Sequence, residues 1–118
     1  MTPRLRLAAA VLYFIFISVM FCLPGSLLPH ENWLSRIYFD KWVHIGFFAV
    51  LLLLWLWWLM PDKRGVLWLL VAAIVYGITV EFVQDRFIPN RSFDLSDWAA
   101  DITGSFAGVW FWNRYIKK

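Results

Sequence analysis

The sequence has a single cysteine, Cys22, which lies within a run of apolar residues. One cysteine excludes an intramolecular disulfide and any metal cluster built from several thiolates. Charged residues are also scarce, at 16% of the 118 residues, and the basic ones are scattered at the ends of apolar runs. Nucleic-acid binding is therefore not expected despite the net charge of +3, because it needs basic residues gathered into a patch.

Apolar residues make up 62% of the chain, a share well above that of ordinary soluble domains, and the mean hydropathy is +0.65. About 20 consecutive apolar residues allow a helix to cross the hydrocarbon core of a bilayer. Predominantly apolar runs cover residues 5–23, 41–60, 66–84 and 97–112. The sequence therefore predicts an all-α fold in which residues 1–118 form one domain, an integral membrane four-helix bundle that contacts the lipid bilayer.

The connections between these spans carry their own signals. The first run is longer than the apolar part of a signal peptide, and no small-x-small cleavage site follows, so we expect an uncleaved helix. Residues 33–38 have apolar and aromatic side chains at helical spacing, which predicts a short interfacial helix between the first and second spans. A tight turn is expected at residues 61–65, and Asp94 or Ser96 is expected to cap the last helix.

The charges predict how the bundle is oriented. Four spans place both termini on one side of the membrane, together with seven of the 11 basic residues. Basic residues accumulate in cytoplasmic segments, so we expect both termini in the cytoplasm. The acidic residues lie almost entirely on the opposite side. Because acids hardly influence insertion, this one-sided distribution needs another explanation. Asp62 is the exception, and the acids expected on the outer side are Glu31, Asp40, Glu81, Asp85, Asp94, Asp97 and Asp101.

Residues 81–108 hold five of the eight acidic residues of an otherwise apolar chain. Glu81, Gln84 and Asp85 are spaced to share one face at the end of the third span. Asp97 and Asp101 share one face at the start of the fourth. We expect these two helix ends to face each other. A carboxyl at the depth of Glu81 is costly unless it is paired or hydrated, which favours a functional role over a structural ion pair with a nearby cation.

A second polar group begins the second span, where Asp40, Lys41 and His44 lie within one helical turn. The imidazole of His44 could carry a proton, bind a metal or donate a hydrogen bond, and Asp40 could orient it. The alternative is an interfacial cap followed by a histidine bonded to a neighbouring helix. On the loop before the fourth span, Arg91 either binds an anionic group such as a phosphate or carboxylate, or pairs with an acid of the same loop.

The sequence does not decide whether a metal or another cofactor binds. Carboxylates and one histidine suit Mg²⁺, Mn²⁺ or Zn²⁺ by ligand type, but no zinc signature with diagnostic spacing occurs. The acids could instead share protons or pair with Lys41 and Arg91. Gly104 and Gly108 form a small-xxx-small pair that allows close helix contact, either within the chain or with a second copy in a homo-oligomer.

The order and spacing of these polar residues resemble the VanZ-like family of small bacterial membrane proteins. The residues that carry the resemblance are Asp40, Lys41 and His44, then Glu81 and Gln84, then Pro89, Arg91, Ser92 and Phe93, and finally Asp97, Ala100, Gly104 and Gly108. The resemblance implies a multi-pass protein of the bacterial inner membrane, in a family named for a member associated with resistance to teicoplanin, a glycopeptide. Asp101 departs from the family, which commonly has asparagine there.

The leading hypothesis is a polar pocket on the extracytoplasmic face that binds or modifies a lipid-linked molecule of the cell envelope. If it is an enzyme, the catalytic residues are Glu81 and His44 as acid and base, with Asp97 and Asp101 orienting water or a metal. The predicted substrate-binding residues are Lys41, Gln84, Arg91 and Asp40. The alternatives are a transporter subunit and a non-enzymatic partner in membrane assembly, although the first span lacks the acid that small multidrug exporters use.

Overall fold

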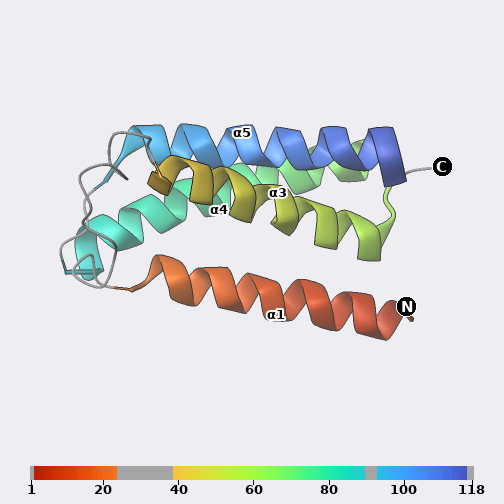
Figure 1. Cartoon of the computed structure of the whole chain (residues 1–118), viewed down its shortest axis with the longest axis horizontal. Coiled ribbons are helices and arrows are strands. Elements are labelled where there is room, and N and C mark those ends of the chain that lie inside the picture. Colours follow the sequence, from red (N-terminus) through yellow and green to blue (C-terminus); the bar gives the residue numbers. More distant parts are fainter. Residues whose placement is uncertain (1, 24–38, 90–92, 117–118) are drawn as a thin grey trace.

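The computed structural model describes residues 2–23, 39–89 and 93–116, and its described residues are helical with no strand. The helices are α1 (Pro3–Phe21), α3 (Phe39–Leu59), α4 (Lys63–Phe87) and α5 (Leu95–Phe111), which continues into the π-helix η2 (Trp112–Ile116). They run up and down as a bundle with both chain ends at the same end (Figure 1). The predicted all-α bundle is confirmed. The predicted interfacial helix at residues 33–38 falls outside the described residues.

Capping side chains set where the helices begin. The α1 helix starts directly after Thr2, whose hydroxyl accepts a hydrogen bond from the backbone N–H of Leu5 at 3.2 Å. The carboxylate of Asp62 caps α4 in the same way, accepting from the N–H of Gly65 at 2.9 Å. The α4 helix therefore begins three residues before the predicted span, because residues 63–65 form its first turn instead of a loop. Asp94 caps α5, which confirms one of the two predicted alternatives.

Within the described ranges, three helices are long and apolar enough to cross a membrane, namely α1, residues 41–59 of α3, and α4. The α5 helix has 17 residues and carries Asp97 and Asp101 in its first half. It lies beside α3 for most of its length (Figure 1). The predicted fourth span, residues 97–112, thus corresponds to the shortest of the four described α-helices.

Two glycines bring the backbones of α3 and α5 together. A Cβ atom added at Gly104 would collide with the carbonyl oxygen of Ile45, and one added at Gly108 would lie 2.6 Å from that of Ala49. Only a residue without a side chain allows this approach. The small-xxx-small face therefore packs against α3 of the same chain, and a homo-oligomer formed through these glycines stays a prediction.

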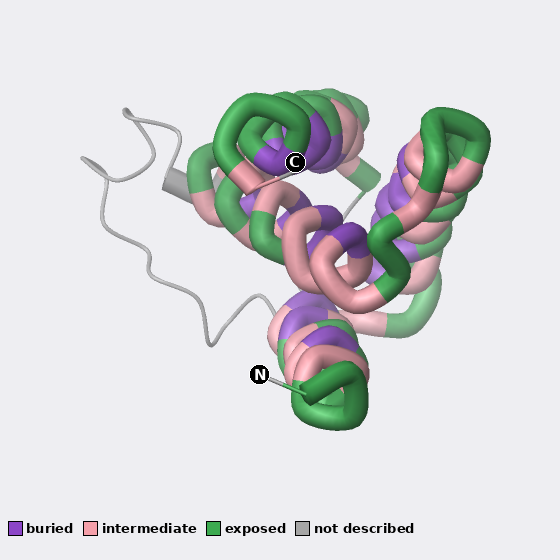
Figure 2. Tube along the Cα trace, turned by 90° about the vertical axis from the view of Figure 1, so that its right-hand side faces the viewer, coloured by how far each residue is buried: buried purple, intermediate pink, exposed green. Residues whose placement is uncertain are grey.

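The buried residues form a core along the bundle axis. Its largest fully buried apolar side chains are Ile17, Phe48, Leu52, Leu56 and Trp112. The buried stretches of all four helices face the centre of the bundle, while exposed residues cover the outside (Figure 2). Many of the outer residues are large and apolar, among them Leu12, Leu67 and Trp68. Such a surface suits contact with lipid, since a soluble monomer rarely exposes extended apolar patches.

Candidate functional site

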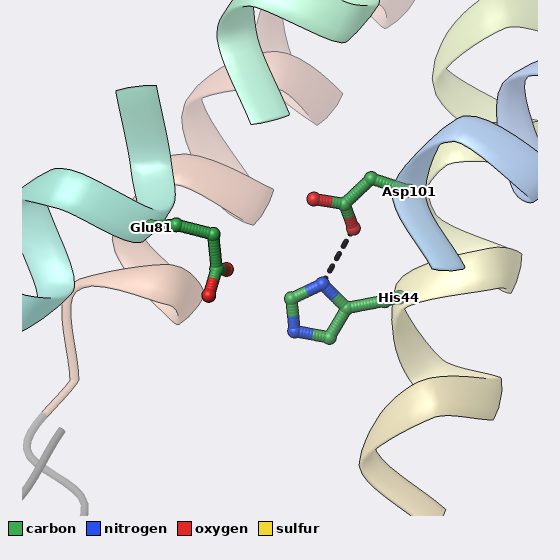
Figure 3. A group of neighbouring side chains, drawn as sticks. All are labelled: His44, Glu81 and Asp101. Carbon is green, nitrogen blue, oxygen red and sulfur yellow. Dashed lines mark hydrogen bonds and ion pairs between the residues drawn. The ribbon is translucent and has the colours of Figure 1, made fainter. Parts of the chain in front are cut away.

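His44 of α3 and Asp101 of α5 form the central pair of a polar cluster at the end of the bundle away from the termini. Their side chains are nearly inaccessible, with 4% and 1% of each residue exposed. The imidazole Nδ1 lies 2.5 Å from Asp101 Oδ1, a short hydrogen bond between helices (Figure 3). The ring of Phe21, the last residue of α1, stacks on the imidazole with 5.0 Å between centroids. The hydrogen bond to Asp101 therefore fixes the imidazole in its plane, and the ring of Phe21 covers its face.

Glu81 reaches the same place from α4 and is fully buried. Its Oε1 accepts a hydrogen bond from the backbone N–H of Asp94 at 3.1 Å, which ties the start of α5 to α4. Within the described part of the chain, Glu81 Oε2 and Asp101 Oδ2 are inaccessible and have no hydrogen-bond partner. Most buried polar atoms in folded proteins are paired, so two unpaired carboxylate oxygens in one cluster are a distinctive feature.

Lys41 lies at the rim of the cluster and joins two acids of the neighbouring helix end. Its Nζ is 2.7 Å from Asp97 Oδ1 and 2.9 Å from Asp94 Oδ2. The other oxygen of Asp97, Oδ2, lies 3.8 Å from His44 Nε2. Asp97 thus stands between the lysine and the imidazole.

Asp94, outside the spanning segments, is held in its ionised form. Burial alone would raise its pKa, but hydrogen bonds from Ser96 and Lys41, together with the charge of Lys41, outweigh this and lower the pKa to about 2. The negative charge also lies next to the first turn of α5, where it interacts favourably with the helix dipole.

The other predicted substrate-binding residues are Gln84, Asp40 and Arg91. Gln84 is buried, and its Nε2 donates to the carbonyl oxygen of Phe21 at 2.8 Å, so the amide fastens α1 to α4. Asp40 is the second residue of α3, but its side chain lies outside the described residues, as does all of Arg91. Among the described residues, Asp101 forms the hydrogen bond with His44 Nδ1, the contact with a neighbouring helix that the sequence offered as one alternative. The orienting role of Asp40 stays a prediction.

Three residues that the sequence did not assign to the site shape it. Phe21 covers the imidazole. Gly77 leaves room for Asp101, since an added Cβ would lie 2.9 Å from Asp101 Oδ2. The indole of Trp98 donates to the carbonyl of Ile74 at 3.1 Å and so helps hold α5 against α4. Only Gly77 had a signal in the sequence, a glycine one turn before Glu81 on the same face.

The arrangement can move a proton or hold a cation. If His44 Nδ1–H donates its hydrogen bond to Asp101, Nε2 is the free basic nitrogen, as in a histidine oriented by a carboxylate. His44, Glu81 and Asp101 each offer one potential metal ligand, and these three atoms lie within 4.8 Å of one another. The four residues predicted as catalytic, namely His44, Glu81, Asp97 and Asp101, all belong to this cluster.

An apolar groove of about 320 Å³ lies between α1, α3 and α4, closer to the chain ends than the polar cluster. Its lining does not include the residues of the polar cluster. Tyr76, at one end of its lining, directly precedes Gly77, which contacts Asp101. The lining residues are Phe14, Leu51, Leu52, Trp55, Leu69, Ala72, Ala73 and Tyr76.

Comparison of the chain with models of known protein families, with curated proteins and with solved structures found no match in any of the three.

Proposed function

We propose that this chain is a bacterial inner-membrane protein that binds or modifies a lipid-linked molecule of the cell envelope through the polar cluster around His44. The observation that carries the proposal is the convergence of His44, Glu81 and Asp101 from three helices of a membrane protein, each at most 4% exposed. Ionisable groups inside a membrane protein are costly, and they commonly mark sites of substrate, ion or proton handling.

The apolar groove supports a lipid as the ligand. A molecule with an anionic head at the polar cluster could place part of its hydrocarbon chain in the groove, since Tyr76 and Gly77 connect the two places along α4. The groove has almost purely apolar walls, which suit a hydrocarbon chain and offer no partner for a polar one. Lys41, partly exposed at the rim, would meet the anionic head.

A reaction at this site would be a hydrolysis or a group transfer. His44, held by Asp101, would act as base or acid through Nε2, and Glu81 would supply the second acid or base. The resemblance to the VanZ-like family adds the cell envelope, and a link to glycopeptide resistance, as the context. Binding without a reaction would use the same residues, and in both cases the lipid is expected to co-purify with the protein.

Lipid retention tests the proposal. The full chain, extracted from bacterial membranes in a mild detergent, is examined by native mass spectrometry for a co-purified lipid of defined mass. We expect one dominant species with a charged head group, reduced at least about tenfold in His44→Ala and Glu81→Gln, because a tenfold loss needs only about 1.4 kcal/mol of binding energy. Asp62→Asn, at the opposite end of the bundle, is the matched control and should keep the lipid.

Equal retention in the two site variants and in the control would count against the proposal. So would a mixture of bulk membrane lipids in place of a dominant species.

Orientation is a second, separate expectation. With seven of the 11 basic residues at the end that carries the termini, the positive-inside rule places the α3–α4 turn in the cytoplasm and the polar cluster on the outer side. A reporter that is active only in the cytoplasm, fused at Asp62, should be active, and a periplasm-specific reporter at the same position should be silent. The reverse pattern would contradict the orientation.

A further inference from the structure

The polar cluster contains more acid than base. Among the described residues around His44 there are four carboxyl groups, those of Glu81, Asp94, Asp97 and Asp101, against two cationic groups at most, Lys41 and a protonated His44. Lys41 contacts Asp94 and Asp97, and His44 contacts Asp101. Among these groups, neither cationic side chain forms an ion pair with Glu81. A buried excess of negative charge requires either bound protons or another cation.

The unpaired oxygens show where another cation would sit. Glu81 Oε2 and Asp101 Oδ2 lack partners among the described residues, and they belong to side chains that are 0% and 1% exposed. The two carboxyls come from different helices, α4 and α5, and both extend toward the space beside the His44 imidazole (Figure 3). Two lone carboxylate oxygens that approach one imidazole from separate helices resemble a ligand set more than a pair of ordinary helix-end acids.

We infer that His44, Glu81 and Asp101 form a binding site for a single divalent metal ion, Zn²⁺ in the first place and Mn²⁺ in the second. Their ligand atoms already lie within 4.8 Å of one another. One imidazole with carboxylates favours these ions over Mg²⁺ and Ca²⁺, which prefer all-oxygen sites. Three protein ligands are also the number found in catalytic zinc sites, which keep one position open.

Asp97 lies outside this ligand set. A metal ion binds one nitrogen of an imidazole; Asp101 lies at His44 Nδ1, whereas Asp97 Oδ2 lies 3.8 Å from Nε2, on the other edge of the ring. Because Oδ1 of Asp97 meets Lys41, the fourth position is left to an oxygen of the ligand. Lys41 then lies where it can pair with the remaining charge of an anionic head group. The contact with an anionic head group rests on the proposed function. The existence of the metal site does not.

Calorimetric titration of the full chain tests the inference. The protein in detergent is stripped with EDTA, dialysed, and titrated with zinc chloride and then with manganese chloride. We expect one Zn²⁺ per chain, with affinity at least about 100-fold lower in Glu81→Gln and Asp101→Asn, since even outer-shell changes cost about 10–100-fold. The matched control is Asp85→Asn. Asp85 lies on the same helix one turn from Glu81, but it is exposed, and its carboxylate accepts from the backbone N–H of Phe93.

Two further measurements keep the test decisive if a variant folds poorly. Zinc should raise the melting temperature of the wild-type chain, as any ligand specific for the folded state does, and should not raise that of Glu81→Gln. X-ray absorption of the zinc-loaded wild type should show nitrogen and oxygen ligands only. Absence of zinc binding to the wild type, equal binding to both site variants, or a sulfur ligand from the exposed Cys22 would overturn the inference.

Lipid analysis of the same samples separates the two proposals. Zinc bound without a specific lipid supports the metal site and counts against the proposed function. A specific lipid retained by a chain that does not bind zinc or manganese overturns the metal site alone.

Discussion

Replacing Gly104 by alanine is expected to lower the free energy of unfolding by about 3 kcal/mol or more, the upper end of the cost of overpacking. The added Cβ would collide with the carbonyl oxygen of Ile45. That oxygen belongs to the backbone of α3, which cannot move aside as a flexible side chain can. The helices must separate, and the contact that positions His44 beside Asp101 is lost with them. Unfolding in mixed detergent micelles, followed by circular dichroism, measures the difference.

Gly46→Ala is the matched control, because Gly46 lies on α3 within two residues of His44 and an added Cβ there has no neighbour within 4 Å. Alanine is the better helix former, so this variant should be as stable as the wild type or up to about 1 kcal/mol more stable. If both glycines tolerate alanine equally well, the close approach of α3 and α5 is not a feature of the folded protein.

The second large effect is expected at the pair of His44 and Asp101. In EDTA, His44→Ala and Asp101→Ala should each destabilise the chain by several kcal/mol, because breaking a buried hydrogen-bonded pair that carries charge costs about 3–5 kcal/mol. The double variant should cost less than both together, with a coupling energy of about 1–3 kcal/mol. The short Nδ1 to Oδ1 distance of 2.5 Å and the near-complete burial of both groups are the reasons.

A second double-mutant cycle, between two distant residues, is the control for the cycle of His44 and Asp101. His44→Ala combined with Asp62→Ala joins two sites at opposite ends of the bundle (Figure 1), and their effects should add within about 0.5 kcal/mol. Additivity in the His44 and Asp101 cycle as well would mean that the hydrogen bond between them contributes nothing to stability.

Much of the fold was visible in the sequence because membrane helices leave strong signals. Each run of apolar residues became a helix, and the acids at residues 81, 97 and 101 lay on faces that the alternation of helix direction brings together. The spacing of three and four residues fixed which side chains share a face. The cluster could therefore be predicted as a set, including His44 from another helix.

Pairing within the cluster was harder to predict, because it depends on the rotation and height of one helix against another. Asp101 bonds the imidazole of His44 because the contact of Gly104 with Ile45 sets the height of α5 against α3. Gln84 shares the face of Glu81, but its amide reaches the carbonyl of Phe21 at the end of α1. Helical periodicity carries no information on such contacts between distant segments.

The position of α5 in the chain has a consequence for biosynthesis. The three helices with enough length and hydropathy to enter a membrane by themselves are made first, and α5, with its two acids, follows last. Charged residues in the middle of a bilayer oppose insertion, so α5 depends on the glycine contact with α3 and on partners such as His44 and Lys41 that are already in place. A nascent chain that ends before Leu95 has its first three helices and Glu81, but it lacks Asp101, the hydrogen-bond partner of the imidazole. The polar cluster is thus completed only when α5 packs against α3 and α4.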